Sequence, residues 1–298
     1  MGRRGVWTGK RLRAISRELA QLGLRVCPNT VRRLLGQLDY ALRANRKSLC
    51  SSSPNRDKQF AYLTYQRQQF YQEGYPVISV DSKKKELVGQ FKNNGRVWAQ
   101  APTLVQDHDF RSQAKGLATP YGIYDLCANR ATVMVGTSHD TPDFAVDAIC
   151  QWWRQEGRRR YPQAPELLIL ADSGGSNGPR CRAWRLALQE KIADSFGLAV
   201  TVCHYPTGAS KWNPIEHRVF SEISKHWAGQ PLADYATMVR LIGETRTRTG
   251  LRVHCTLNTR YYPTKIAISK DQMGAMDLLA HTTLPDCNYT VFPRTTRN

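Results

Sequence analysis

The sequence predicts an α/β protein with a mixed sheet covered by helices on both faces, preceded by a small all-α helix-turn-helix domain. Three short runs, 77–81, 167–171 and 198–203, are apolar on both faces, which is typical of central strands buried between helical layers. The segments after residue 75 follow the order β-β-β-α-β-α-β-α, whereas those before residue 42 show only helical spacing.

The N-terminal part of the chain contains two helical patterns. Apolar residues recur on one face of each: Leu12, Ile15, Leu19 and Leu22 in the first, and Val31, Leu34, Leu35 and Leu38 in the second. Gly23 is expected to end the first helix, and Asn29 or Thr30 to cap the second. With Arg32 and Arg33 projecting from the second helix, the pattern favours a DNA-binding helix-turn-helix over a solvated helical hairpin.

The charge of the chain indicates an anionic partner. The 298 residues include 43 Lys and Arg against 24 Asp and Glu, a formal net charge of +19. The first 50 residues hold 12 Lys or Arg against only Glu18 and Asp39, and double-stranded DNA is the partner we expect. No CxxC pair and no long apolar run occur, which favours a cytoplasmic protein with reduced thiols and no membrane contact.

Four parts are predicted along the chain: a helix-turn-helix domain (1–42), a linker and connecting helix (43–74), a catalytic domain (75–228), and a C-terminal segment (229–298) that packs on the catalytic core. Asn93, Asn94 and Gly95 form a hairpin signal behind the first strand. Two further helices are predicted from the residues at their ends. Gly197 is expected to end the first, and Asn213 is expected to cap the second, which has Pro214 at its first position.

The C-terminal segment carries a helical apolar pattern at 232–242, then a strand and a short helix within 266–279, and a terminal strand near 289–292. We expect this segment either to complete the core of its own protomer or to help assemble a homo-oligomer on DNA.

Three acidic residues fall where one edge of the predicted sheet would bring them together. Asp81 and Asp172 each end a core strand, and Glu216 lies in the first turn of a helix. An unpaired cluster of carboxylates repels itself, and a divalent cation resolves that conflict. Hard oxygen ligands select Mg²⁺ or Mn²⁺, and two ions per active site suit phosphoryl transfer.

Each acid also has a structural interpretation. Asp81 and Asp172 are suited to Asx turns, and Glu216, three residues after Asn213, is suited to a capping box. The basic chain and the helix-turn-helix pattern favour the catalytic interpretation.

Four long motifs resemble those of the ISAzo-type bacterial insertion-sequence transposases, a branch near the mariner-like DDE enzymes: VISVDSKKKELVGQFKNNGRVW, LADSGGSNGPRCRAW, HYPTGASKWNPIEHRVFSEIS and LIGETRTRTGLRV. The resemblance runs from about residue 7 to 293. It implies an RNase H-like catalytic core, a metal-binding triad of Asp81, Asp172 and Glu216, and a transposon end as substrate. Family members usually have a longer N-terminal region, so a shortened copy is expected here.

Several neighbours of the acids are candidate DNA contacts. Lys83 and Lys84 follow Asp81, where they suit either phosphate contact or a soluble hairpin. Asn177, in the glycine-rich loop after Asp172, is expected to help hold a phosphate; its alternative is to cap the next helix. Lys211 and Trp212 suit a phosphate and an unpaired base, although a packed tryptophan is the commoner outcome.

Three functions stay open on the sequence. The first is a transposase in which water frees a 3′-OH at each transposon end and that hydroxyl attacks target DNA. The second is another RNase H-like nuclease or integrase with the same metals. The third is a truncated, non-catalytic remnant that only binds DNA.

Overall fold

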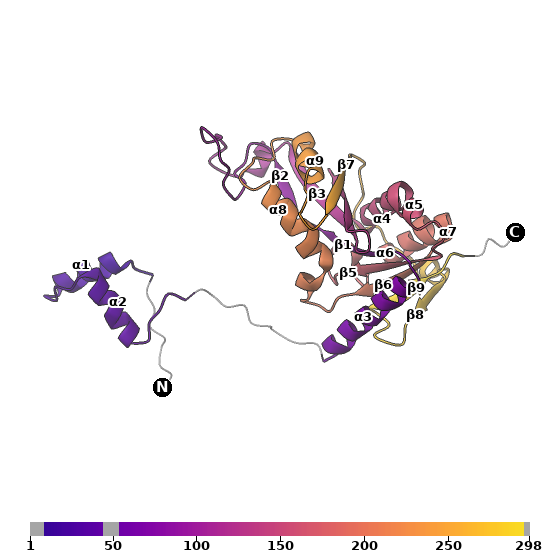
Figure 1. Ribbon diagram of the computed structural model, residues 1–298, viewed down its shortest axis with the longest axis horizontal. Coiled ribbons are helices and arrows are strands. Elements are labelled where there is room, and N and C mark those ends of the chain that lie inside the picture. The colour runs from indigo at the N-terminus through magenta and orange to yellow at the C-terminus, as the bar shows by residue number, and fades with distance from the viewer. Residues whose placement is uncertain (1–8, 44–53, 295–298) are drawn as a thin grey trace. The chain divides into compact units, whose positions relative to one another are not determined.

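The computed structural model describes residues 9–43 and 54–294, and the chain forms two compact units, Met1–Ser52 and Ser53–Asn298. The first unit contains the two predicted helices, α1 (Leu12–Gln21) and α2 (Pro28–Gln37), shown in Figure 1. Most of the predicted linker lies outside the described residues, and the connecting helix is α3 (Arg56–Gln72).

The predicted cap of α2 is wrong. Cys27, rather than Asn29 or Thr30, is the N-cap residue, and its Sγ accepts a hydrogen bond from the Thr30 N–H at 3.4 Å. The helix begins earlier than predicted because Pro28 at its first position has a φ that already suits a helix. Arg32 and Arg33 are exposed, as expected of residues that project from this helix.

Within the described residues, the second unit is built on a nine-stranded mixed sheet. The strands are β1 (Val77–Ser82), β2 (Glu86–Val88), β3 (Gly116–Asp125), β4 (Arg130–Gly136), β5 (Glu166–Ala171), β6 (Ala199–His204), β7 (Arg252–Asn258), β8 (Leu278–Ala280) and β9 (Asn288–Val291). Their order is β7-β4-β3-β1-β5-β6-β9-β8, with β2 paired to β3. The pairs β1–β5, β5–β6 and β4–β7 are parallel, whereas β3 runs antiparallel to both of its long neighbours.

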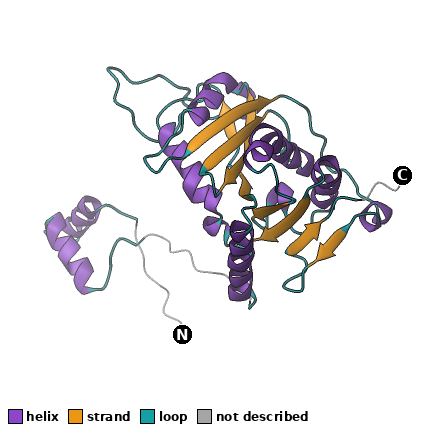
Figure 2. Cartoon of the chain, turned by 45° about the vertical axis from the view of Figure 1, so that its right-hand side comes forward, coloured by secondary structure: helices purple, strands orange, loops and turns teal. Residues whose placement is uncertain are grey.

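Helices cover both faces of this sheet, which confirms the predicted RNase H-like mixed sheet (Figure 2). The remaining helical segments are α4 (Pro142–Trp152), η2 (Trp153–Gly157), α5 (Arg158–Arg160), η3 (Gly175–Asn177), α6 (Arg182–Leu188), η4 (Gln189–Ala193), α7 (Asp194–Phe196), η5 (Ser210–Trp212), η6 (Glu216–Phe220), α8 (Ser221–His226), α9 (Tyr235–Gly243), α10 (Lys270–Gly274) and the short η1 (Arg111–Gln113). One core cluster joins the sheet to α4, α6 and η4. Two further clusters join the other face to α3 and to η6, α8 and α9.

The hairpin predicted at Asn93, Asn94 and Gly95 is wrong. This turn docks onto the segment after α8: the Asn93 side chain donates hydrogen bonds to the carbonyls of Trp227 and Gln230, both at 3.1 Å. The short strand β2 pairs with β3 instead, through the register of Leu87 with Leu117. A side-chain amide that satisfies two distant carbonyls therefore fixes this turn in place of local strand pairing.

The C-terminal segment extends the same sheet at both edges. β7 pairs with β4 at one edge, and β9 and β8 follow β6 at the other. The sequence pattern missed β7, and it placed a strand before the short helix where the structure has α10 before β8. The segment thus supplies part of the core of its own protomer.

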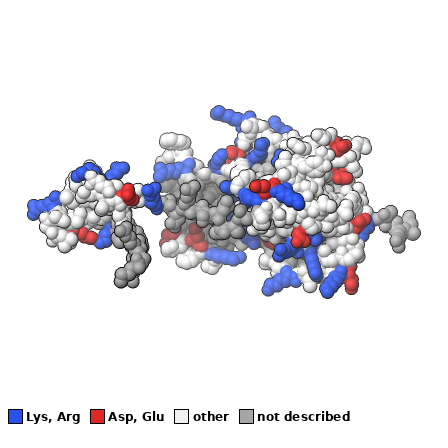
Figure 3. Space-filling model, turned by 90° about the horizontal axis from the view of Figure 1, so that it is seen from below, with Lys and Arg blue, Asp and Glu red and all other residues white. Residues whose placement is uncertain are grey.

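Basic side chains prevail on the surface, as the composition requires. On the face in Figure 3, Lys and Arg outnumber Asp and Glu. No helix in residues 9–43 and 54–294 is long and apolar enough to cross a membrane.

Candidate active site

The sheet brings the predicted acids to one edge. β1 and β5 are parallel neighbours, and the last pair of their register joins Val80 to Ala171. Asp81 and Asp172 directly follow these two residues, so they leave adjacent strands at the same level. Glu216 begins η6, the segment that crosses the sheet face beside β3.

The electrostatics of Asp81 link it to the other two acids. Asp81 is only 7% exposed. Its burial, followed by the charges of Asp172 and Glu216, raises the pKa of Asp81 to about 8. Burial also raises the pKa of Asp172, as do the charges of Glu216 and Asp140, although the Gly174 N–H opposes that shift with a hydrogen bond at 3.2 Å.

Asn213 ties the Glu216 segment to β1. This fully buried residue accepts a hydrogen bond from the Ser79 hydroxyl at 2.5 Å and donates to the Val80 carbonyl at 3.0 Å. The Ser79 hydroxyl in turn accepts from the N–H of Ile215 at 3.0 Å. Asn213 does precede the helix as predicted, but its side chain serves the strand rather than a capping box.

Close packing sets the position of Glu216. A side chain at Gly122 of β3 would place a Cβ 2.7 Å from carbons of both Ile215 and Phe220, so only glycine lets this helix approach the strand. Glu216 also opens a π-helical stretch, a local widening often found at functional positions.

Three further oxygens at this edge lack partners. The buried side-chain atoms Ser82 Oγ, Tyr121 Oη and Asp140 Oδ1 form no hydrogen bond in the described residues. Ser82 and Tyr121 face each other across β1 and β3. The pKa of Tyr121 is raised by burial and then by the charges of Asp81, Asp140 and Asp172, which places its hydroxyl among the acids.

This oxygen-only, negatively charged set matches the chemistry of a hard divalent cation. Acids whose charges raise the pKa of a neighbouring carboxyl, as at Asp81 and Asp172, gain from a positive ion, and unpartnered oxygens are free to coordinate it or to hold its water. In the described residues, no three His, Cys, Asp or Glu side chains stand close enough to hold a metal as they are arranged. The acids at this sheet edge therefore suit a divalent cation in their ligand type and charge. To coordinate one, their side chains must move closer together.

Asp140 is a residue that sequence reasoning missed. It lies between the end of β4 and the start of α4, and β4 runs in the same direction as β1 because both are antiparallel to β3. Its loop therefore leaves the sheet at the edge of Asp81 and Asp172. The available signal was an acid a few residues after a core strand, the same signal that marked the other two.

The loop after Asp172 is compact. Gly175 adopts φ +66°, which favours glycine, and Asn177 is buried with no partner for its Nδ2. The ring of the buried His204 faces the Asn177 carbonyl at 2.9 Å. Asn177 does not cap the next helix, since Cys181 is the N-cap of α6; phosphate contact by Asn177 stays a prediction.

The predicted basic contacts lie in different environments. Lys83 points inward: its Nζ is 3.3 Å from Glu86 Oε1 and 4.8 Å from the centre of the Trp227 ring. Lys84 is exposed, as are Lys211 and Trp212. Lys211 Nζ lies 4.1 Å from the centre of the Trp212 ring. Lys84 and Lys211 are both exposed and available to a DNA backbone, whereas Lys83 is paired with Glu86.

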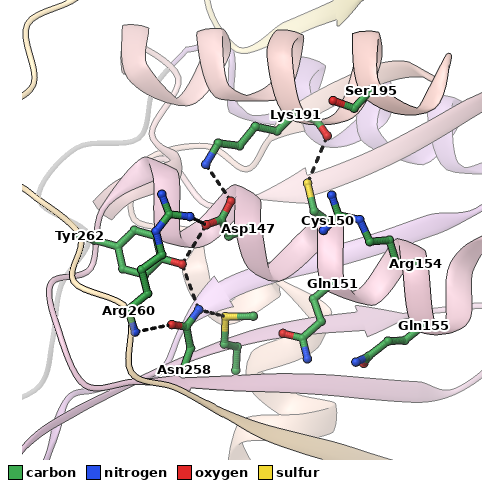
Figure 4. A pocket seen from close by; sticks show the side chains of 11 residues that line it. Asp147, Cys150, Gln151, Arg154, Gln155, Lys191, Ser195, Asn258, Arg260 and Tyr262 are labelled. Atoms are coloured by element: carbon green, nitrogen blue, oxygen red, sulfur yellow. Dashed lines mark hydrogen bonds and ion pairs between the residues drawn. The ribbon is translucent and has the colours of Figure 1, made fainter.

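The pocket drawn in Figure 4 is separate from the candidate active site. Its cavity of about 630 Å³ lies between α4, η4 and the segment after β7, and none of the three predicted catalytic acids lines it. Asp147 is at the centre of its hydrogen-bond network. Its Oδ1 lies 2.7 Å from Lys191 Nζ, and its Oδ2 lies 2.8 Å from both Arg260 Nη1 and Tyr262 Oη. Because Asp147 pairs with both Lys191 and Arg260, this network joins the C-terminal segment to the helical layer.

The fold places the chain in the RNase H-like class. The chain matches the family model described as Rhodopirellula transposase DDE domain over residues 3–293. It therefore belongs to this family of DDE transposases, which confirms the resemblance seen in the motifs.

Solved structures of the mariner transposase Mos1 are similar at low identity. The paired-end complex with left transposon end shares 12% identity over 82% of this chain and 74% of that chain, with a TM-score of 0.47. The strand transfer complex shares 15% over 82% and 73%, also at 0.47, and the paired end complex with Mn shares 13% over 82% and 74%, at 0.45. No curated protein matches the chain. The assignment rests on the family match.

Proposed function

We propose that this protein is a DNA transposase that cleaves transposon ends and joins the freed 3′-OH to target DNA by two-metal phosphoryl transfer. The observation that supports the proposal most is that Asp81 and Asp172 leave adjacent parallel strands at one sheet edge and that the charges of Asp172 and Glu216 both act on Asp81, in a chain of the DDE transposase family. The net charge of +19 supports a polyanionic substrate.

Each residue has a separate task in this proposal. Asp81, Asp172 and Glu216 hold the divalent ions, Mg²⁺ or Mn²⁺, and Asn213 keeps the first and third of these acids in register. When bound, the ions would activate an attacking oxygen and stabilise a leaving one. Lys84 and Lys211 are exposed to the phosphates beside the scissile bond, and Arg32 and Arg33 on α2 contact the DNA outside it.

Joining two transposon ends requires two active sites held together, so we expect a homo-oligomer on DNA. The bacterial cytoplasm, where the nucleoid is accessible, is the expected place of action. The Mos1 complexes named above hold transposon ends, and we carry that class of substrate to this chain on the family match.

The test uses full-length protein and DNA carrying the inverted repeats that flank its gene. Asp81→Asn, Asp172→Asn and Glu216→Gln should each abolish strand cleavage in Mg²⁺ and leave DNA binding, measured without metal, largely intact. Asp286→Asn and Glu73→Gln are matched controls, because both residues are exposed and lie outside the candidate site.

Metal binding gives a second readout. Titration calorimetry with Mn²⁺ should show two ions per wild-type chain with DNA and a loss of binding in the triad variants. Wild-type protein that binds the ends but never cuts them would instead support the non-catalytic remnant. Cutting without strand joining would support a nuclease.

A further inference from the structure

A second pocket lies between α3 and η6, the helical segment that begins with Glu216. Its volume is about 340 Å³. Six of its lining residues carry the argument: Arg67, Tyr71, Tyr124, Trp212, His217 and Arg218. We call this the α3–η6 pocket.

The positive charges of this pocket are not neutralised by acidic side chains of the described residues. No carboxylate lines it, and within residues 9–43 and 54–294 neither Arg67 nor Arg218 forms an ion pair with an acid. The Arg67 Nε is buried and has no hydrogen-bond acceptor, while its Nη2 reaches only the Tyr71 hydroxyl at 3.5 Å. An anion in this pocket would supply the acceptor that Arg67 lacks.

The pocket also offers aromatic surface. Tyr71 is 39% exposed and Trp212 is 41% exposed, so part of each ring is open to a ligand. Trp212 packs edge-on against Phe60, with ring centres 5.8 Å apart, and the Arg56 guanidinium lies 4.7 Å from the centre of its ring. Lys211 Nζ lies 4.1 Å from the same centre, so a base that stacks on Trp212 displaces this exposed lysine side chain. A partly exposed aromatic ring that its neighbours hold in place offers a face on which a flat ligand can stack.

The location connects the pocket to the reaction. His217 and Arg218 directly follow Glu216, and Tyr124 lies on β3 two residues from Gly122, the register partner of Asp81. The pocket therefore shares η6 with the candidate active site and extends from there toward the start of β1, where the N–H of the lining residue Leu126 donates to the Val77 carbonyl at 3.1 Å. A DNA strand that followed η6 away from Glu216 would enter the pocket at His217 and Arg218.

We infer that the α3–η6 pocket binds one unpaired nucleotide of the DNA strand held at the active site, with its base on Tyr71 and Trp212 and its phosphate on Arg67 and Arg218. A duplex backbone needs only an open cationic surface, whereas an aromatic cavity admits a base that has left the helical stack. The inference rests on the proposed function and adds to it the recognition of single-stranded DNA next to the cut.

The test measures binding of transposon-end duplexes that carry a short single-stranded extension, in the absence of divalent metal. Each nucleotide of the extension is replaced in turn by an abasic one. At one position the loss of the base should weaken binding by about 5–150-fold, the range for a base stacked on aromatic side chains. Tyr71→Leu should remove that dependence on the base, whereas Tyr65→Leu, an exposed tyrosine of α3 outside the pocket, should keep it.

The phosphate contact is measured separately. Arg67→Gln and Arg218→Gln should weaken binding of the extended duplex more than binding of a blunt one, with Arg252→Gln on β7 as the control. Photocrosslinking of 5-iodouracil at the sensitive position should label the peptide that contains Tyr71 or Trp212.

The outcomes separate the two proposals. If no abasic position matters while Mg²⁺ still supports cleavage, the pocket does not hold a base and the proposed function stands. If only the arginine variants weaken binding, the pocket contacts backbone alone and the stacking role is wrong. If the ends are neither bound nor cut, the pocket inference fails together with the proposed function.

Discussion

The Ser79 hydroxyl donates a 2.5 Å hydrogen bond to the side-chain oxygen of Asn213, and both residues are fully buried. This bond joins the middle of β1 to the turn before η6, which are 134 positions apart in the sequence. The Asn213 amide group also approaches Asp81 Oδ2 at 3.4 Å. One buried amide therefore sets the spacing between β1, which carries Asp81, and η6, which begins at Glu216.

Removing this amide should damage both stability and cleavage. Asn213→Ala leaves Ser79 Oγ without its acceptor and the Val80 carbonyl without its donor, and a buried unsatisfied group costs about 1–3 kcal/mol. We expect urea denaturation to show a loss in that range, together with slower strand cleavage. Asn94→Ala, whose side chain is exposed, serves as the control.

A double-mutant cycle with Ser79→Ala decides whether the pair acts as a unit. The coupling should be about 0.5–3 kcal/mol, the range for residues in direct contact. Additive losses would mean that Asn213 acts through the backbone of β1 alone.

The central strands, and the acids Asp81 and Asp172 that follow their apolar runs, were predictable because the sequence patterns that mark them are local. A run such as 167–171 is apolar on both faces, which suffices to place it at the centre of a sheet, and an acid after such a run lies at the strand end. Asn213 was misinterpreted for the same reason. An Asn before a Pro is a complete capping signal by itself, and nothing nearby shows that Ser79 is its partner.

Edge elements escaped the sequence pattern for a different reason. β7 mixes exposed, half-buried and buried residues, with Arg252 and His254 exposed on either side of the buried Val253, so it lacks the apolar run that marks a central strand. Asp140 does not follow β4 directly, because a short loop separates it from the last strand residue, Gly136. Its position beside Asp172 depends on how β4, β3 and β1 pair, which is a property of the sheet rather than of the loop.

Asp140 should tune metal binding. Because its free Oδ1 and the Tyr121 hydroxyl border the carboxylates, Asp140→Asn should weaken Mn²⁺ affinity by about 10–100-fold, the usual effect of removing a residue that supports metal ligands. The Mg²⁺ concentration for half-maximal cleavage should rise in parallel, while cleavage recovers at saturating metal.

Asp107→Asn is the matched control for Asp140→Asn, since its carboxylate is 91% exposed in the loop before η1. Unchanged Mn²⁺ affinity in the Asp140 variant would remove this residue from the metal site, whatever the effect on cleavage.

The N-terminal unit should supply much of the salt-dependent DNA affinity. Deleting residues 1–52 leaves the second compact unit and removes 12 Lys or Arg. The slope of log K against log salt concentration should become shallower by about 0.9 for each DNA phosphate that the shortened protein no longer neutralises. Arg32→Gln combined with Arg33→Gln should produce part of that change, because both side chains are exposed on α2.

An unchanged slope after the deletion would place the main DNA surface on the catalytic unit. In that case Lys84, Lys211 and the arginines of the α3–η6 pocket are the residues to replace next.

The C-terminal end of the chain should be held by a pH-dependent ion pair. Asp194, at the start of α7, accepts hydrogen bonds from Arg294 Nε at 3.0 Å, from the Arg294 backbone N–H at 2.9 Å and from Gln189 Nε2 at 2.8 Å. Partial burial opposes ionisation, but the Arg294 and Gln189 hydrogen bonds outweigh it, so the pKa of Asp194 lies below its usual value of 3.8. The ionised carboxylate therefore stabilises the folded chain.

A lowered pKa gives stability that is complete above the unfolded value and is lost as the pH falls through the folded one. Asp194→Asn should therefore reduce the free energy of unfolding by about 0.5–1 kcal/mol at pH 6, as expected for a partly exposed ion pair. The difference between wild type and variant should begin to shrink below about pH 4, near the unfolded pKa, and should disappear once the pH lies below the lowered pKa of the folded state, where wild-type Asp194 also loses its charge. Urea denaturation at pH 6 and pH 3 measures it, with the exposed Asp286→Asn as control. A difference that persists undiminished at pH 3 would mean that the neutral hydrogen bonds to Gln189 and the backbone, rather than the charge, hold the chain end against α7.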